Sequence, residues 1–212
     1  MKTFAEHVLS FYKDLKITSR LPKGVVVLNP YLDDQAFPYC AQFYNKFYCD
    51  NDERTIIFGI NPGRHGGGMT GIPFTDPAKL EQVCGIANPF TKKAELSADF
   101  IYTMISAYGG PAQFYRRFYF SAVSPLGFTM DGKNLNYYDI KELQIALKDF
   151  IVESLHKQLV FGVNKSFCFC LGEGDNFKYL TRLNSELKIF EKIVKINPND
   201  SSVYIVLGDT CL

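Results

Sequence analysis

The sequence predicts an α/β fold, a three-layer α/β/α sandwich around a central parallel sheet of about four strands. Short apolar runs rich in β-branched and aromatic residues alternate with longer amphipathic segments along the chain. Polar residues stand directly after three of the apolar runs, where parallel strands would end at one edge of a sheet and form a site. These polar residues are Asn61, Ser124 and Asn197.

Five helices or strands are predicted in the first half of the chain. Residues 4–15 carry apolar side chains at helical spacing, and residues 24–29 form a short apolar run, typical of an edge strand, that ends at Asn-Pro. Residues 35–48 predict a helix rich in aromatic side chains. Residues 55–60, Thr-Ile-Ile-Phe-Gly-Ile, predict the first central strand, and residues 96–108 predict a helix.

The second half continues the alternation. Residues 118–123 predict the second central strand, and residues 139–161 predict one long amphipathic helix. Residues 165–172 and 192–196 predict the third and fourth strands, with a helix over residues 177–190 between them.

Length and composition predict a single domain over residues 1–212. The chain has 47% hydrophobic residues and no linker rich in Pro, Gly or Ser. No apolar run is long enough to span a membrane, and the first residues lack the pattern of a secretory signal, so no membrane association is expected. The net charge of +1 gives no general attraction to nucleic acid, and phosphate contacts would have to come from a local patch.

The six cysteines show no C-x-x-C pairing, so no metal or iron–sulfur site is expected. Cys168 and Cys170 lie two apart in a predicted strand and would share one face as small apolar side chains. Free thiols are typical of a reducing compartment, which predicts a cytoplasmic protein.

Residues 59–74, Gly-Ile-Asn-Pro-Gly-Arg-His-Gly-Gly-Gly-Met-Thr-Gly-Ile-Pro-Phe, are the most informative stretch. Pro62 fixes its own φ and favours an extended Asn61, which holds that amide rigidly at the end of a strand. The glycines that follow allow tight turns and the close approach of another molecule to the backbone.

The segment Gly-Ile-Asn-Pro-Gly at residues 59–63 resembles the first motif of the uracil-DNA glycosylase superfamily. Thr-Gly-Ile-Pro-Phe at residues 70–74 is similar to its continuation in the single-strand-selective monofunctional branch, and residues 124–128 with 132–135 resemble the second conserved block of that branch. The similarity is greatest to the bacterial second subfamily and extends to about residue 195.

The resemblance implies roles for four residues of the first motif. Asn61 would position the attacking water, although an asparagine here could also be a structural amide that caps the turn. Phe74 would stack on the extruded base, although a phenylalanine after a proline is more often part of a core. Ile60 and Gly63 would contact the substrate, with the main chain of Ile60 recognising the base.

The second block departs from its relatives. The human-type branch has an asparagine that reads the uracil edge where this chain has Ala122. Ser121 or Ser124 could supply a shorter hydrogen-bonding group, and a local turn bond by the serine before Pro125 is an equally good interpretation. Serine hydroxyls read a base less exclusively than an amide, so this block predicts a looser choice of base.

The C-terminal part differs most. The branch carries a His-Pro motif after the fourth strand, whose imidazole stabilises the departing base, and this chain has Asn197-Pro198, as in the mismatch-specific branch. Asn197 is therefore the second candidate catalytic residue, and its lack of an imidazole predicts weak activity. A short β-like run is expected at residues 203–207. His65 would be a loop side chain rather than a substitute for the missing histidine.

Charged residues in the two blocks suggest DNA contacts. Arg64 lies in the glycine loop and Lys133 in the loop of the second block, and both are expected to bind DNA. Asp33 and Asp34 are candidate carboxylates for the water or the sugar, but an exposed turn or a helix cap explains them better.

These observations predict a monofunctional uracil-DNA glycosylase that acts as a monomer on uracil-containing single- or double-stranded DNA without a cofactor. Two alternatives stay open. One is a nucleic-acid-binding relative that lost turnover with the His-Pro motif. The other is a small-molecule hydrolase or phosphate-binding enzyme, which is disfavoured because the loop has neither Gly-Lys-Ser/Thr nor G-x-G-x-x-G spacing.

Overall fold

The computed structural model describes residues 2–197, and the expected run at residues 203–207 lies outside them. The predicted central sheet is confirmed: four parallel strands lie side by side in the order β3-β2-β6-β7. Their bounds are β2 (Thr55–Gly59), β3 (Phe118–Ala122), β6 (Phe167–Leu171) and β7 (Lys192–Ile196). Side chains on β2 and β3 are almost fully buried, as expected for strands that are covered on both faces.

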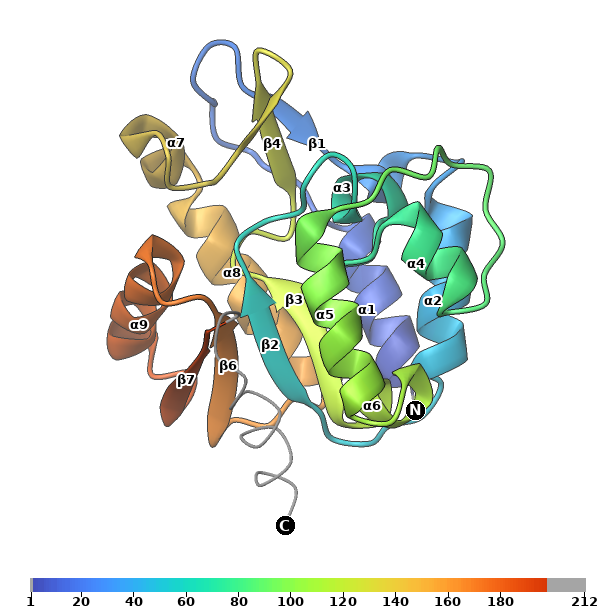
Figure 1. The fold of residues 1–212 in the computed structure, drawn as a ribbon. Coiled ribbons are helices and arrows are strands. Elements are labelled where there is room, and N and C mark those ends of the chain that lie inside the picture. The colour runs from blue at the N-terminus through green and yellow to red at the C-terminus, as the bar shows by residue number, and fades with distance from the viewer. Residues whose placement is uncertain (1, 198–212) are drawn as a thin grey trace.

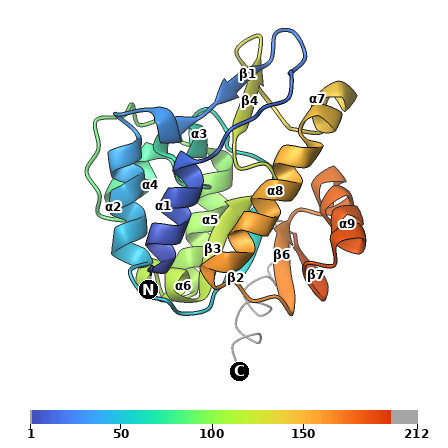
Figure 2. The same ribbon diagram turned by 180° about the vertical axis from the view of Figure 1, so that it is seen from behind.

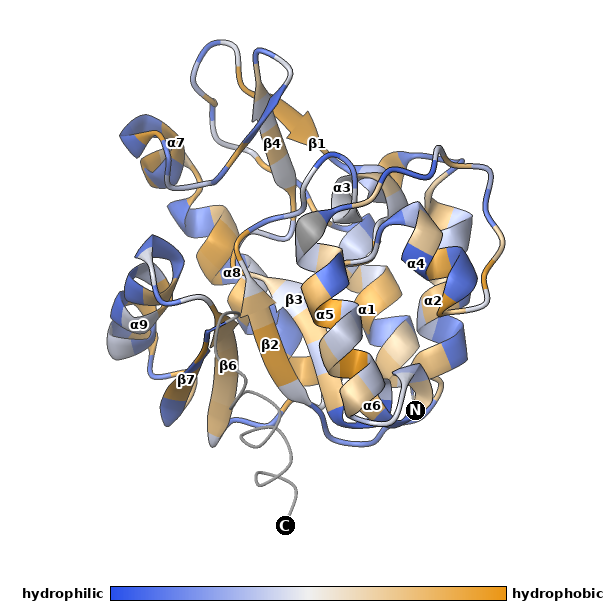
Figure 3. Cartoon of the chain, viewed as in Figure 1, coloured by the Kyte–Doolittle hydropathy of each residue, from blue (hydrophilic) through white to orange (hydrophobic). Residues whose placement is uncertain are grey.

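Helices cover both faces of this sheet, which gives the three layers predicted from the sequence (Figures 1 and 2). Helices α5 and α6 lie in front of β3 in Figure 1, and α1 and α8 lie behind it and come forward in Figure 2. Apolar residues concentrate on the central strands, whereas α7 and α9 carry many hydrophilic residues (Figure 3). The main helices are α1 (Phe4–Lys13), α2 (Phe37–Phe47), α5 (Leu96–Ala107), α6 (Pro111–Arg117), α8 (Lys148–Gln158) and α9 (Asp175–Leu187).

A second, antiparallel sheet lies beyond the carboxyl ends of β2 and β3 (Figure 1). It consists of β1 (Val26–Leu28), β4 (Gly127–Met130) and β5 (Lys133–Leu135) in the order β1-β4-β5. The strand expected at residues 24–29 is thus present, but it pairs outside the central sheet. The β4–β5 hairpin, with Asp131 and Gly132 in its turn at positive φ, was not predicted.

The prediction of a single helix over residues 139–161 is wrong. The segment forms α7 (Lys141–Ala146), α8 and a short 3₁₀ turn, Leu159–Phe161. Leu147 alone separates α7 from α8, and its ψ of −6° interrupts the α-helical repeat while its side chain is fully buried. The helical spacing of the apolar residues continues through this residue, which is why the sequence predicted one helix.

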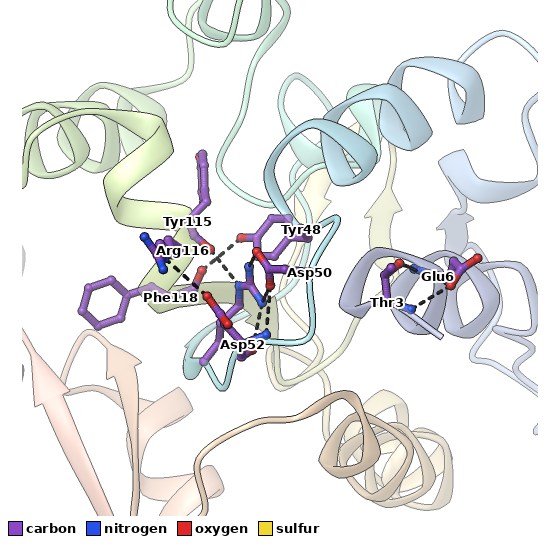
Figure 4. A network of polar contacts seen from close by, with 9 residues as sticks. Thr3, Glu6, Tyr48, Asp50, Asp52, Tyr115, Arg116 and Phe118 are labelled. Atoms are coloured by element: carbon purple, nitrogen blue, oxygen red, sulfur yellow. Dashed lines mark hydrogen bonds and ion pairs between the residues drawn. The ribbon is translucent and has the colours of Figure 1, made fainter. Parts of the chain in front are cut away.

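A buried arginine joins the N-terminal helix to the sheet, and its neighbours Tyr48, Asp50 and Tyr115 are labelled in Figure 4. Arg54 is fully buried, donates from Nε to the carbonyl of Tyr115 at 2.8 Å, and pairs with Asp50 at 2.8 Å. Its guanidinium lies 4.7 Å from the ring centre of Phe4 and 4.8 Å from that of Tyr48. The helix that carries Phe4 begins with a capping box between Thr3 and Glu6, drawn in the same figure. The charge is therefore compensated by a carboxylate, carbonyl oxygens and two aromatic faces.

Two predictions from composition can be compared with the structure. Cys168 and Cys170 are both fully buried on one face of β6, as expected. Within the described residues, no helix is long and apolar enough to cross a membrane.

Candidate functional site

A pocket of about 210 Å³ lies where β2 ends and the glycine-rich loop begins. This volume is below the range of sites for drug-sized ligands and suits a single small ring. It is the place where parallel sheets generally bind ligands, outside the carboxyl ends of their strands. The lining residues are Ile60, Asn61, Pro62, Gly63, Gly67, Pro73, Phe74, Glu95, Ser97, Ala122, Asn134 and Asn136.

Asn61 is held in one orientation by the last residue of β5 and the chain that follows it. Its Nδ2 donates to the carbonyl of Leu135 at 3.2 Å, and its Oδ1 accepts from the backbone N–H of Tyr137 at 3.0 Å. Each of these atoms keeps one further hydrogen-bonding position, because an amide has two donor hydrogens and two acceptor lone pairs. The side chain is therefore fixed as a structural amide and can still orient a water in the pocket.

The position of Asn61 is reinforced from α9. Asn176 is buried, donates to the carbonyl of Gly59 at 3.2 Å, and accepts from the hydroxyl of Tyr137 at 2.8 Å. The end of β2 and the segment after β5 are therefore tied to the same helix start.

Phe74 forms another wall of the pocket and has an unusual backbone. Its φ is +57°, in the left-handed region that bulky residues seldom adopt. The ring lies directly over Gly59, where a Cβ would overlap it, and its edge meets Phe120 at a centroid distance of 5.3 Å. Strained backbone of this kind is common at binding sites, and here it aims a half-buried aromatic face at the cavity.

Ile60 and Gly63, the two predicted substrate contacts, both line the pocket. The carbonyl of Ile60 accepts from the N–H of Ser124 at 3.1 Å, and the carbonyl of Gly59 accepts from that of Val123 at 3.0 Å. The two sequence blocks that are distant in the chain are thus joined by main-chain hydrogen bonds at the pocket.

The structure does not bring Ser121 and Ser124 into the pocket. Successive residues of a strand point to opposite faces, so Ala122 lines the pocket and Ser121 faces α8, where its hydroxyl donates to Gln158 at 2.5 Å. The Ser124 hydroxyl is buried and donates to the carbonyl of Leu126 at 2.9 Å, the local turn bond considered as its alternative. The wall that would read a base edge at this position is a methyl group.

Asn197 follows β7, and it is not among the residues that line the pocket. The strand β6 lies between β7 and β2, so the ends of these two strands are roughly 10 Å apart. His65 also lies outside the lining residues. Asp33 and Asp34 are exposed away from the pocket, and Asp33 accepts from the N–H of Gln35 at 2.7 Å, the exposed turn expected from the sequence.

Arg64 and Lys133 lie on the two segments that meet at Asn134, which lines the pocket. The N–H of Arg64 donates to Oδ1 of Asn134 at 3.0 Å, and Lys133 precedes that asparagine in β5. Both basic side chains are exposed. Exposed cations on segments that line a cavity are suited to contact phosphates.

Four polar lining residues were not among the predicted site residues: Glu95, Ser97, Asn134 and Asn136. Asn134 stands in the second conserved block, which was a usable signal, whereas Glu95 stands before a helix and lies in neither block. Burial raises the pKa of the Glu95 carboxyl, the negative charge of Asp76 raises it further, and a hydrogen bond with Ser97 opposes both. Among the described residues, no group of three or more His, Cys, Asp or Glu side chains could hold a metal ion.

Comparison with known proteins agrees with this geometry. The model of the uracil DNA glycosylase superfamily matches residues 46–206. The chain belongs to this superfamily. Among solved structures, wild-type SMUG2 of Pedobacter heparinus is 43% identical with a TM-score of 0.90, and the alignment covers all of this chain and 92% of that one. The chain therefore falls in the SMUG2-like branch of the uracil-DNA glycosylase superfamily, as its motifs indicated. No curated protein matches it.

Proposed function

We propose that this protein is a monofunctional uracil-DNA glycosylase, which hydrolyses the bond between an extruded uracil and deoxyribose. The observation that supports this best is one pocket that combines the fixed Asn61 amide with the face of Phe74. Its family and its SMUG2-like relative agree with a DNA glycosylase-type hydrolase whose partner is DNA.

The reaction assigns a task to each wall of the pocket. The base would enter from DNA by flipping and stack on Phe74, with the main chain of Ile60 and Gly63 at its edge. Asn61 would hold the water that attacks the sugar carbon as the bond to the base breaks. Arg64 and Lys133 would hold the flanking phosphates. No lysine lines the described pocket wall, which supports water as the nucleophile.

The range of bases follows from the wall at Ala122. A methyl group cannot test the hydrogen-bonding edge of a base, so we expect excision of uracil and also of some deaminated purines, above all when they are unpaired. Asn134 and Asn136, which do line the pocket, would supply a less restrictive set of polar contacts.

The test is incubation of the whole protein with single- and double-stranded oligonucleotides that contain uracil, xanthine or hypoxanthine, followed by alkali. The proposal predicts a break at the uracil position that needs alkali, because a monofunctional enzyme leaves an intact abasic site. A break without alkali would indicate lyase chemistry, and excision of uracil alone would contradict the loose base choice.

A second candidate is a nucleic-acid-binding relative with little or no turnover. It is favoured by Asn197, which stands where the resemblance expects a histidine and can offer only a neutral hydrogen bond to the departing base. This candidate predicts binding to uracil-containing DNA without abasic sites.

If Asn197 supplies the hydrogen bond to the departing base, Asn197→His should raise the rate of uracil excision. An unchanged rate would remove Asn197 from the mechanism.

A further inference from the structure

Glu95 is the one ionisable side chain that lines the pocket within the described part of the chain. Its half-buried carboxyl lies against the glycine loop, so close to Gly63 and Gly66 that a Cβ on either residue would overlap its oxygens. The two glycines thus make room for this carboxyl group. Because these two loop residues have no side chains, the Glu95 carboxyl can reach the pocket from outside the loop.

The main chain of Glu95 is fixed on both sides. Asp76, which is only 1% exposed, accepts from the Glu95 N–H at 3.2 Å through one oxygen and caps α4 (Pro77–Gln82) through the other. The carbonyl of Glu95 accepts from Ala98 at 2.9 Å in the first turn of α5. Glu95 occupies the N-cap position of α5, but its side chain makes no capping bond and extends to the loop.

The proposed reaction needs a group that accepts a proton from the attacking water, and Asn61 cannot be that group. An amide orients water but does not take a proton at physiological pH, and both polar atoms of Asn61 already hold backbone partners. The other polar side chains that line the pocket are asparagines and a serine, which do not accept a proton at physiological pH. The carboxylate of Glu95 is the one basic group that faces the same cavity.

We propose that Glu95 is the general base of the glycosylase reaction. This inference rests on the proposed function. The water oxygen bonds to C1′ of the sugar, the C1′–N bond breaks, and its electron pair leaves with the base as an anion. The proton released by the water passes to the Glu95 carboxylate, and solvent later takes it up and protonates the base. The negative carboxylate also stabilises the positive charge that develops on the sugar ring.

A base must be ionised, so the rate should fall as the pH falls through the pKa of Glu95. That pKa is raised by burial and by Asp76, and the acid limb should therefore lie above the range of an ordinary glutamate, about 4.3. The elements packed against Glu95 carry other charged or titratable side chains. They are Arg64 and His65 on the glycine loop, Lys133 on β5, and the Asp99–Lys79 pair on α5 and α4. Burial, Arg64 and Lys93 lower the pKa of His65.

The test is single-turnover excision from a uracil-containing single-stranded oligonucleotide between pH 4.5 and 9, with DNA affinity and melting temperature measured in parallel. Glu95→Gln keeps the shape and polarity of the side chain. It should lower the rate by about 10²- to 10⁴-fold, abolish the acid limb and leave DNA affinity near that of the wild type. Glu95→Asp should keep the acid limb at a reduced rate. Asp99→Asn, an exposed carboxylate one helical turn away, is the matched control and should behave as the wild type.

Three results would overturn the proposal while uracil excision by the wild type stands. They are a Glu95→Gln rate within about threefold of the wild type, an acid limb that persists in that variant, or a wild-type rate that falls as the pH rises, which would make Glu95 a proton donor. A wild-type protein that excises no uracil would reject the proposed function itself, and this inference with it.

Discussion

At the residue scale, the pocket depends on the absence of a side chain at Gly59. The Phe74 ring occupies the space that a side chain on Gly59 would need, and the ring reaches that place only through the left-handed backbone of Phe74. The aromatic face is therefore set by two residues of the first motif, fifteen positions apart in the sequence. This pairing explains why the motif ends at a phenylalanine.

Gly59→Ala should displace the Phe74 ring and lower uracil excision by roughly 10-fold or more, because base–aromatic stacking contributes about 1–3 kcal/mol. The measurement is the single-turnover rate, with melting temperature as a check on folding. Gly174→Ala is the matched control, since a Cβ there meets open space at an ordinary φ. A Gly59→Ala enzyme with the wild-type rate would mean that Phe74 is only a core residue.

The sequence predicted the pocket residues best where their spacing after a strand decides where they lie. Asn61, Ile60, Gly63 and Phe74 all line the pocket because they follow one strand in one motif. Ser121 was placed wrongly because a strand alternates its side chains, and a shift of one position moves a group to the other face. Glu95 could not be found at all, since its contact with the glycine loop depends on how α5 packs.

At the element scale, the central strands and most helices were predictable because their apolar periodicity and their burial agree. The break at Leu147 was not, since no Gly or Pro marks it and the residue is as buried as Leu143 and Ile151, one helical turn away on either side. The β4–β5 hairpin was missed because its strands are short and follow a Ser-Pro-Leu-Gly stretch that looks like a loop. The short helices α4 and α6 were not predicted either, because six or seven residues carry too little apolar periodicity.

The link between α1 and β2 gives a prediction about stability. Burial opposes ionisation of Asp50, but hydrogen bonds from Arg54 and from the Asp52 N–H outweigh it and lower the pKa of Asp50 below its ordinary value. Asp50→Asn should reduce the free energy of unfolding at pH 7 by about 1–2 kcal/mol, a modest amount because the Asp50 side chain is 42% exposed.

A lowered pKa stabilises the fold above the unfolded value of about 3.9, and this stabilisation is lost as the pH falls further. The difference between Asp50→Asn and the wild type should therefore shrink below about pH 4 in denaturant titrations. Asp52→Asn, whose partner Arg116 is exposed, is the control and should cost less than about 0.5 kcal/mol. A difference that stays constant from pH 7 to pH 3 would show that the ion pair contributes nothing.

At the scale of the whole molecule, near-neutral charge limits how DNA can be held. The net charge is +1, and the exposed basic residues Arg64 and Lys133 lie on the glycine loop and on β5, two segments that meet at Asn134. Under the proposed function, base recognition and phosphate contact would both lie at one end of the molecule, beyond the carboxyl ends of the central strands.

Replacing Arg64 and Lys133 together by Ala should weaken binding to single-stranded DNA and reduce the slope of log affinity against log salt by about 1.4, since each phosphate contact contributes about 0.7. Fluorescence anisotropy over a salt series measures both. The control replaces Lys165 and Lys192, exposed lysines at the amino ends of β6 and β7, and should leave the slope unchanged. Equal slopes for all three proteins would place the DNA elsewhere.

The most direct test of the account is the excision rate of Asn61→Ala. Loss of the amide should cost at least about 100-fold in single-turnover uracil excision, with DNA binding retained and the free energy of unfolding lower by about 1 kcal/mol for the lost bonds to Leu135 and Tyr137. Asn88→Ala is the matched control, because the Asn88 side chain likewise makes two hydrogen bonds to backbone groups but lies outside the pocket, and this variant should excise at the wild-type rate. Wild-type excision by Asn61→Ala would contradict the account, since Asn61 would then be a purely structural amide.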